Sequence, residues 1–412
     1  MSPAATEDPF VGKAEWFDHG YRETTHARIR LELVLERLLR RLPPPPARVL
    51  DAGGGTGAFS IPLALRGYEV TVLDRSAEWL SVAGTNAASA GVSVRLVEGP
   101  AEQAPSLTPG PFDAVLCHTV LIYAEDPAGV LSALRDVAVP GALLSSLEKN
   151  RDALAVRPAK QGDFAEALRV MDDPVASGRL GIPNRALSSG ELRSMMVATG
   201  WVPTGWGGIR VHSDGVLQPV DPETFDTLMA LDRKASTGEP HRRFGRLLHV
   251  FARAWEPEPL GAIQERSFER AGPGLLESWP PANALSLADL DGFVDRKRYA
   301  GLSTTRPGGR PHSTMVAYCL RDGRIWLPSV GQAQRLRNVE AEPSATLLVT
   351  EGEGDHHVAV LIEGSVTVRR DVNALLDGWL REAWRERYGS ELTWAGAVIE
   401  LVPTKVLSHD AR

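Results

Sequence analysis

The sequence predicts two domains of different classes: a doubly wound α/β domain with a parallel sheet, and after it an antiparallel β domain. With 412 residues the chain is too long for one typical domain. Up to about residue 255, short apolar runs alternate with helical stretches, which is typical of a parallel sheet. Beyond residue 284, short alternating runs follow one another between turn signals, which is typical of hairpins.

An amphipathic helix and a series of short strands are predicted in the first domain. Residues 28–42 repeat Leu at helical spacing, and Pro43 to Pro46 end the helix because proline removes a backbone donor. The runs ARVLDA and YEVTVLD lie about 20 residues apart and predict two buried strands with a helix between them. Further strands are predicted at 92–99, 112–118 and 141–148.

A linker is predicted at 256–284, because this stretch is rich in Pro and Gly and carries no sustained hydrophobic period. The domains are therefore expected at 1–255 and 285–412. Strands of the second domain are predicted in YAGLSTT, HSTMVAYCL, RIWLPSV, ATLLVTEG, HVAVLIEGSVTVRR and AVIELVPTKVL, with one helix at 373–387. No repeat relates the two halves, so they are different domains.

Composition and charge exclude several classes of protein. Apolar residues at 43% and charged residues at 24% are near the averages of soluble globular proteins, which excludes disordered and fibrous chains. The net charge of −7 gives no electrostatic reason to expect nucleic acid binding across the surface. Cys117 and Cys319 lie about 200 positions apart, which excludes a disulfide framework and a zinc site built from cysteines.

Signals for membranes and export are weak in this sequence. No apolar run approaches the roughly 18 residues that a membrane span requires. The first residues, MSPAATEDPF, lack the basic start and apolar core of a signal peptide. We therefore expect a cytoplasmic protein with no membrane partner and no metal site.

A glycine loop with an acidic partner predicts a nucleotide cofactor. The run VLDAGGGTG places Asp51 at the end of a strand, followed by Gly53, Gly54 and Gly55 at the start of a helix. Glycines allow the tight turn and the close approach of a ligand to the backbone. Asp74 ends the next strand, where a carboxylate can accept both hydroxyls of a ribose. The alternative is a tight turn without a ligand.

The aspartate before these glycines resembles class I S-adenosylmethionine (SAM) methyltransferases, not the dinucleotide fingerprint. Four segments extend the resemblance: VLDAGGGTG, FDAVLCHTVLIYAEDP, VPGALLS and GIRVHSD…EPHRRFGRLLHVFARA. Together they resemble the bacterial tRNA 5-carboxymethoxyuridine carboxyl methyltransferase family over roughly residues 15–255. The resemblance implies a Rossmann-like fold and SAM-dependent methyl transfer.

SAM contacts are implied by this resemblance at eight positions: Arg30, Asp51, Gly53, Gly54, Gly55, Asp74, Ala101 and His118. Arg30 would pair with the methionine carboxylate, because a guanidinium forms charge-assisted bonds to carboxylates. Asp74 would accept from the ribose, and the chain around Ala101 would contact the adenine. The alternatives are a solvated helix face for Arg30 and a core histidine for His118.

Methyl transfer requires mainly alignment, because the sulfonium of SAM already activates the methyl group. A carboxylate nucleophile needs no base, whereas a phenol or an amine can need one. His118, Tyr123 and Arg210 are the catalytic candidates, and Arg210 can hold a substrate anion. Asn150 and His212 are further candidates at the mouth of the cleft. A structural role is the alternative for each of these residues.

The sequence departs from the family at a segment that bears on the acceptor. Family members that act on tRNA carry a lysine run where this chain has IPNRALS (182–188), in which Arg185 is the basic residue. Residues 1–256 hold 27 Lys and Arg against 31 Asp and Glu, a net charge of −4. Because nucleic acid affinity depends on neutralised phosphates, we expect a small-molecule acceptor and consider nucleic acid unlikely as a partner.

The C-terminal domain has a resemblance of its own. Residues 287–349 run in order through a helix, a strand ending L-x-T, a G-R-P turn, a strand and a basic segment. This order resembles the pyridoxamine 5′-phosphate oxidase-like split barrel, over 285–409. It implies FMN or the deazaflavin F420 as cofactor, bound between the barrels of a homodimer. Gln332 and Ala333 stand where family members often carry a phosphate-binding Ser or Thr.

The implied contacts to this cofactor come from two segments. Arg335, Arg337 and Asn338 would meet the phosphate, because arginine forks bind phosphate oxygens. Ser303 and Thr304 would lie against the isoalloxazine ring or the ribityl chain. The alternative is a barrel that keeps its fold, forms dimers and binds no cofactor.

The leading hypothesis is SAM-dependent O-methylation of a small-molecule carboxylate or hydroxyl, with the barrel supplying dimerisation or flavin-type redox chemistry. One rival is an FMN- or F420-dependent oxidoreductase with an accessory SAM domain. A second rival is a tRNA wobble-uridine carboxyl methyltransferase. A third is a non-catalytic, dimeric protein that senses SAM.

Overall fold

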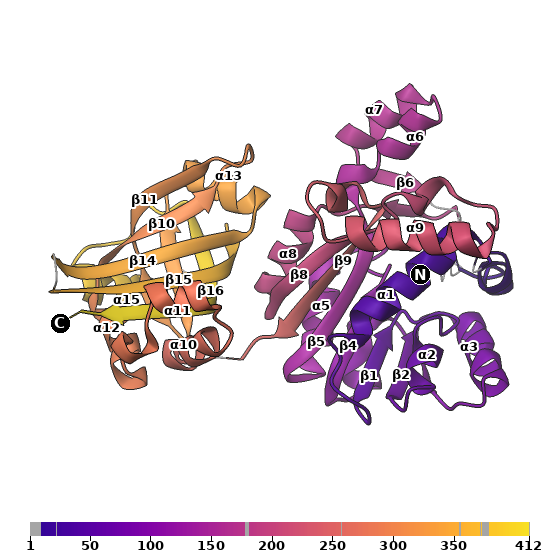
Figure 1. Cartoon of the computed structure of the whole chain (residues 1–412), viewed down its shortest axis with the longest axis horizontal. Helices are drawn as coiled ribbons and strands as arrows, with labels where there is room; N and C mark the ends of the chain where they lie inside the picture. The colour runs from indigo at the N-terminus through magenta and orange to yellow at the C-terminus, as the bar shows by residue number, and fades with distance from the viewer. Residues whose placement is uncertain are drawn as a thin grey trace, which may run out of the picture. The chain divides into compact units, whose positions relative to one another are not determined.

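The computed structural model describes residues 10–21, 23–177, 181–256, 258–353, 356–370, 372 and 379–411. The chain divides into two compact units, Met1–Trp255 and Glu256–Arg412, each with its own sheet (Figure 1). Among the described residues, no helix is long and apolar enough to cross a membrane. In the same part of the chain, no group of His, Cys, Asp and Glu residues could hold a metal ion.

The first unit is built on a seven-stranded mixed sheet with the order β3-β2-β1-β4-β5-β9-β8. Strands β1 to β5 pair in parallel, and β9 and β8 complete the sheet in antiparallel pairing. The bounds are β1 Arg48–Ala52, β2 Glu69–Asp74, β3 Arg95–Glu98, β4 Phe112–His118, β5 Ala138–Lys149, β8 Trp201–Ile209 and β9 Leu247–Ala254. This confirms the predicted doubly wound, Rossmann-like class.

Helices cover both faces of this sheet. Helix α1 packs against one face with Ile29 and Leu33, and α5 and α8 pack against the other with Leu131 and Leu192. The bounds are α1 Thr25–Leu39, α2 Ser60–Ala64, α3 Ala77–Ser89, α4 Ala104–Leu107, α5 Pro127–Asp136, α8 Ser189–Ala198 and α9 Pro222–Ala235. Helix α1 ends before Pro43, as the sequence predicts.

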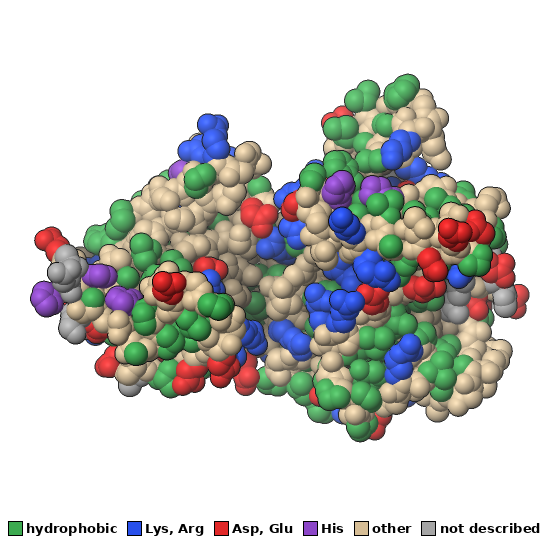
Figure 2. Space-filling view, viewed as in Figure 1, with side chains coloured by type: hydrophobic (Ala, Val, Ile, Leu, Met, Phe, Trp, Pro, Cys, Tyr) green, Lys and Arg blue, Asp and Glu red, His purple; other side chains and the backbone are tan. Residues whose placement is uncertain are grey.

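A smaller excursion follows β5. It contains α6 Val156–Lys160, α7 Phe164–Asp172 and the two-stranded sheet of β6 Val175–Ser177 and β7 Pro183–Arg185. Helix α7 exposes one apolar face, with Phe164, Leu168 and Met171 each about two-thirds exposed. The tip formed by α6 and α7 accordingly shows a group of hydrophobic side chains (Figure 2).

The second unit is a curled, all-antiparallel sheet with the order β11-β10-β14-β15-β16-β13-β12. The bounds are β10 Tyr299–Thr305, β11 Pro311–Ala317, β12 Cys319–Arg321, β13 Arg324–Ser329, β14 Ser344–Glu353, β15 His356–Arg369 and β16 Ala397–Asp410. This arrangement confirms the predicted antiparallel split barrel. Its helices are α10 Leu260–Glu269, α11 Pro273–Ser278, α12 Leu287–Arg296, α13 Gln334–Ala341 and α15 Trp379–Tyr388. Residues 373–378 of the predicted helix lie outside the described residues.

Part of the stretch predicted as a linker is helical. Helix α10 buries Leu260, Ile263, Gln264 and Ser267, which lie on one helical face. Half of that face is polar, so its hydrophobic period is too weak to see in the sequence. The polar members bond to β16: Ser408 Oγ donates to Gln264 Oε1 at 2.5 Å, and the backbone N–H of residue 406 donates to Ser267 Oγ at 3.0 Å.

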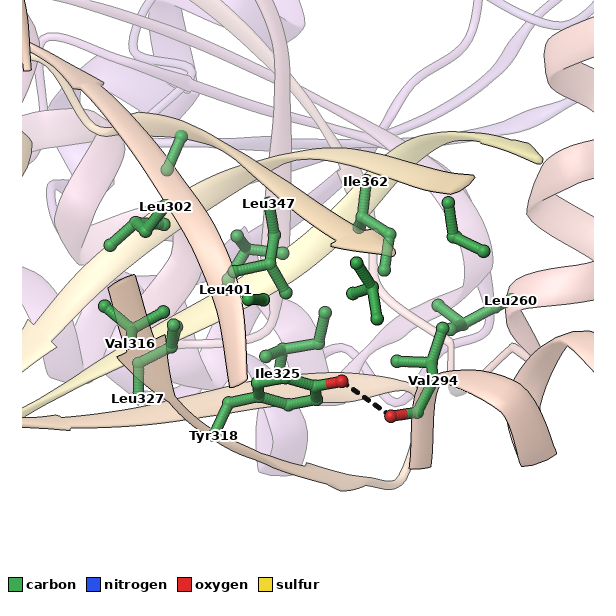
Figure 3. Packing of buried hydrophobic residues seen from close by; sticks show 14 of the residues in the cluster. Leu260, Val294, Leu302, Val316, Tyr318, Ile325, Leu327, Leu347, Ile362 and Leu401 are labelled. Carbon is green, nitrogen blue, oxygen red and sulfur yellow. Dashed lines mark hydrogen bonds between the residues drawn. The ribbon is translucent and has the colours of Figure 1, made fainter. Parts of the chain in front are cut away.

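The apolar core of the second unit lies between the sheet and helices α10 and α12. Leu302, Leu347 and Leu401 point into it from three strands (Figure 3). The Tyr318 hydroxyl donates to the Val294 carbonyl at 2.6 Å, which ties β11's end to α12 (Figure 3). This bond satisfies two polar groups that burial would otherwise leave unpaired.

A charged group crosses three strands of the barrel. Glu400 on β16 is fully buried and forms ion pairs with Arg324 on β13 and with Arg369 on β15, the latter at 2.9 Å. A buried carboxylate is stable when it is paired in this way, and its loss leaves charges without a partner. The pairing therefore favours the register in which these strands lie together.

We expect Glu400→Ala to destabilise the second unit by about 3 kcal/mol, because two partly buried arginines lose their shared partner. Hydrogen exchange of peptides from β15 and β16 measures this unit separately from the first. The matched control is Glu363→Ala, which removes a half-exposed ion pair to Lys405 on the same two strands. That change should lower the free energy of unfolding by less than about 1 kcal/mol. Equal effects of the two variants would contradict the expectation.

Candidate functional site

A cavity of about 930 Å³ opens at the carboxyl ends of the parallel strands. Parallel α/β sheets bind ligands at this edge. Its walls come from the ends of β1, β2 and β4, from α1, and from the α6–α7 excursion. Of the residues implied by the sequence, it is lined by Arg30, Gly53, Gly55, Asp74, Ala101, His118, Tyr123 and Arg210.

The glycine loop has a backbone that other residues would strain. Gly53 and Gly55 have φ angles of +69° and +55°, which favour glycine. A Cβ on Gly53 would lie 2.3 Å from Val120 Cγ2, and a Cβ on Gly54 would lie 2.8 Å from Val72 Cγ1. Gly53 and Gly55 thus present bare backbone to the cavity, while Gly54 permits close packing of the loop on the sheet.

The two aspartates of the loop have different surroundings. Asp74 lines the cavity and accepts the N–H groups of Gly55 at 2.9 Å and Ser76 at 3.0 Å. Each carboxylate oxygen keeps acceptor capacity for a hydroxyl group. Asp51 is buried beneath the loop and accepts from Ser60 Oγ at 2.6 Å; burial raises its pKa to about 6. Asp74 faces the cavity, whereas Asp51 anchors the start of α2.

His118 belongs to a buried hydrogen-bonded chain. Its Nε2 lies 2.9 Å from Ser145 Oγ, which lies 2.9 Å from Nε2 of His249. Burial, and then the positive charge of Arg30, lower the pKa of His118 to about 3. The imidazole is therefore neutral at pH 7, and it is a poor acceptor for a substrate proton.

The N-terminal segment from Phe10 to Phe17, here called the strap, lines part of the cavity. The N–H groups of Gly12 and Ala14 donate to the Glu78 carboxylate at 2.6 and 3.2 Å. The Trp79 indole donates to the Phe10 carbonyl at 3.1 Å. Phe10 also packs edge-on against Tyr123. Sequence reasoning missed this strap, since its aromatic residues show no period.

The far end of the cavity is basic. Lys149, Arg157, Arg210 and Arg246 line it, together with the amide of Asn184. Except for Arg210, these residues were not predicted, because they come from separate elements with no common motif. Arg210 has a φ of +60°, is almost fully buried and pairs with Asp214.

Two further candidates serve the structure around this end. Asn150 is fully buried and donates through Nδ2 to the carbonyls of Arg243 at 2.9 Å and Gly245 at 2.8 Å. The His212 backbone N–H donates to Asp232 at 2.7 Å. Neither residue is among the described cavity-lining residues.

Two of the candidate residues in the barrel contact each other, and a third contacts a neighbouring strand. The Asn338 amide on α13 donates to Thr304 Oγ1 on β10 at 2.9 Å, and both residues are buried. Ser303 Oγ lies on the exposed side of β10, 2.9 Å from Ser313 Oγ. Thr304 and Asn338 thus hold α13 on the sheet.

The two arginines of α13 carry the positive charge that a cofactor phosphate needs. Arg335 donates through Nε to Ser329 Oγ at 2.9 Å, and Arg337 donates to Gln334 at 2.6 Å. Burial lowers the pKa of Arg335, so an anion beside it would offset a desolvated charge. Arg335 and Arg337 supply positive charge for a phosphate, while Thr304 and Asn338 are engaged with each other.

Comparison with known proteins agrees with both halves of the architecture. Residues 50–145 match the model of the family described as methyltransferase domain, and residues 288–410 match the one described as pyridoxamine 5′-phosphate oxidase. The fold, the glycine loop and the first match define a SAM-dependent methyltransferase.

Two sequence relatives indicate which methyltransferases this chain is similar to. The tRNA 5-carboxymethoxyuridine methyltransferase of Escherichia coli K12 is 30% identical over 58% of this chain and 94% of its own length. A ubiquinone biosynthesis O-methyltransferase of Xylella fastidiosa is 33% identical over 36% of this chain and 59% of its own. The chain belongs to the family of SAM-dependent methyltransferases that includes the E. coli protein, and its second unit matches the model described as pyridoxamine 5′-phosphate oxidase.

A solved structure is also similar to the first unit. It is a SAM-dependent methyltransferase of Thermotoga maritima, described as a possible histamine N-methyltransferase. The identity is 19%, with a TM-score of 0.37, over 60% of this chain and 96% of the other.

We expect Asp74→Ala to weaken binding of SAM and S-adenosylhomocysteine (SAH) about tenfold or more, because hydrogen bonds to a charged group contribute about 1.5–3 kcal/mol. Calorimetry with SAH measures the change. The control is Glu98→Ala, since Glu98 ends β3 directly beside Asp74 but is not among the described lining residues. An unchanged SAH affinity in Asp74→Ala would show that this carboxylate does not hold the ribose.

Proposed function

We propose that the first unit transfers the methyl group of SAM to an oxygen of a small anionic acceptor, with a carboxylate as the nucleophile. The observation that carries the proposal is the basic far end of the cavity, lined by Lys149, Arg157, Arg210 and Arg246. These positive charges attract an anion into a partly enclosed space, where water screens them less than at the surface.

The weak basicity of His118 favours a carboxylate acceptor over a hydroxyl acceptor. SAM supplies an activated methyl group, and the protein holds the two reactants in line and excludes water. A carboxylate is already nucleophilic at neutral pH, whereas a hydroxyl can require a base. Burial and the charge of Arg30 lower the pKa of His118 to about 3, so this imidazole is a weak base, and its Nε2 contacts Ser145 Oγ. The reaction converts a carboxylate and a sulfonium into a neutral ester and a neutral thioether.

A tRNA acceptor is the second candidate, because the E. coli relative is named for that substrate. Ion pairs among other charged residues of the first unit favour a small molecule instead. Glu239 pairs with Arg242 at 2.6 Å and with Arg243 at 2.9 Å. Glu191 lies 3.0 Å from Arg151 and 3.7 Å from Arg185. These carboxylates offset positive charge that a phosphate backbone would otherwise contact.

For the second unit we propose a role in pairing two copies of the chain. The outer face of β10, β11 and β14 exposes Tyr299, Met315 and Leu348, which are 59%, 67% and 41% exposed. Gly301 stands opposite both Met315 and Leu348 in the register, so the row has a flat centre. FMN or F420 is a further candidate ligand, with Arg335 and Arg337 as its phosphate contacts. A bound flavin would supply redox chemistry, and the protein would then be bifunctional and yellow.

We expect methyl-labelled SAM to label small carboxylic acids from cell extracts, in products that release methanol on mild alkaline hydrolysis. Methyl esters release methanol in this way, whereas methyl ethers do not. Parallel reactions with phenols and with total tRNA test the two alternatives, and Asp74→Ala at subsaturating SAM is the control with reduced labelling. Label that enters tRNA, or that resists alkali, would contradict a small carboxylate acceptor.

We expect the chain to sediment as a dimer and Met315→Glu to sediment as a monomer, because a charge on the paired face loses its hydration. The matched control is Met171→Glu on α7, since that side chain is 66% exposed in the first unit. Sedimentation velocity measures both variants. A wild-type monomer, or a dimer that Met171→Glu separates and Met315→Glu does not, would contradict pairing through the barrel.

A further inference from the structure

Lys149 is held in a defined position among the basic residues that line the cavity. It is the last residue of β5, its side chain is buried, and it lines the cavity. Its Nζ donates to Asn184 Oδ1 at 2.9 Å. The Asn184 amide nitrogen donates to the Ile182 carbonyl at 3.0 Å, which fixes the orientation of the amide. An ammonium has three donors, and in the described part of the chain Asn184 takes one of them.

Charged groups from four other segments line the same cavity as Lys149. Arg246 precedes β9, Arg157 lies on α6, Arg210 follows β8 and Glu166 lies on α7. Glu166 accepts two bonds from Arg169, at 2.6 and 2.7 Å, so much of its charge is already compensated. The positive charge of Arg246 therefore acts against the charged form of Lys149, and the partly compensated charge of Glu166 acts for it.

This arrangement is costly without an anion. Burial, and then the charge of Arg246, lower the pKa of Lys149 to about 8, while Glu166 raises it. A desolvated cation beside other cations gains most from an anionic ligand, and such perturbed groups concentrate at functional sites.

We infer that Lys149, oriented by Asn184, is the residue that recognises the anionic group of the acceptor and selects a carboxylate over its neutral counterpart. The inference rests on the proposed methyl transfer and adds the residue that determines specificity. The two remaining donors of the ammonium would bind carboxylate oxygens, with Arg210 and Arg246 beside them.

The competing role for Lys149 is that of a general base for a hydroxyl acceptor, and the two roles have opposite pH dependence. As an anion-binding residue, Lys149 acts in its charged form, so anion affinity is full below pH 8 and is lost as the pH rises above it. As a base, Lys149 acts in its neutral form, and activity rises over the same range. Glu148 on the same strand also titrates here, because burial raises its pKa to about 8. A control must therefore separate the two residues.

The test measures binding of benzoate to the full-length protein saturated with SAH, by calorimetry below and above pH 8, with neutral benzamide as the matched probe. We expect wild type to prefer benzoate and to lose about tenfold in benzoate affinity for each pH unit above 8. Lys149→Met should bind benzoate at least tenfold more weakly, with benzamide and SAH affinities unchanged. Lys149→Arg should keep benzoate affinity and lose its pH dependence.

Several results would overturn the inference. They are equal affinity for benzoate and benzamide in wild type, no benzoate binding by wild type, or unchanged benzoate affinity in Lys149→Met. The same pH dependence in Lys149→Arg would assign the titration to another group, such as Glu148. If wild type does not bind SAH, the proposed methyl transfer itself is contradicted. That result can be distinguished from a failure that concerns only the role of Lys149.

Discussion

The cavity depends on the close approach between the backbone at Gly53 and the side chain of Val120. This contact joins the end of β1 to the loop that follows β4, and only glycine leaves the space for it. The same loop is held from the other side, because the N–H of Leu121 donates to the buried Glu148 at 3.2 Å. The glycine loop after β1 and the loop after β4 are therefore parts of one packed unit. A change at Gly53 or at Val120 would move both loops.

Charge is distributed unevenly along this cavity, and the distribution matches the reaction. Asp74 lines it next to Arg75, and Lys149, Arg210 and Arg246 line it together with Glu166. In the proposed reaction, the sulfonium of SAM would face an anionic acceptor that the basic residues attract. Transfer of the methyl group would neutralise both reactants, so the product would lose the attraction that held the acceptor in place.

The parts of the site that sequence could predict are local ones. The glycine loop and Asp74 follow from a strand, a tight turn and a fixed interval, which nearby residues determine. Lys149 and Asn184 lie 35 positions apart and meet because β5 and β7 converge on the cavity, so no spacing identifies them. The α10 helix was missed for a different reason, since its buried face bonds through polar groups.

The two units treat buried polar groups differently, and this separates their roles. In the barrel, Glu400 is matched by Arg324 and Arg369, and Thr304 by Asn338, so these buried groups satisfy one another. In the first unit, buried basic groups converge on a space large enough for a ligand. Satisfied networks specify a fold, whereas charged groups that line a cavity can also contact a ligand. Methyl transfer therefore belongs to the first unit, and the exposed outer strands of the barrel are suited to association.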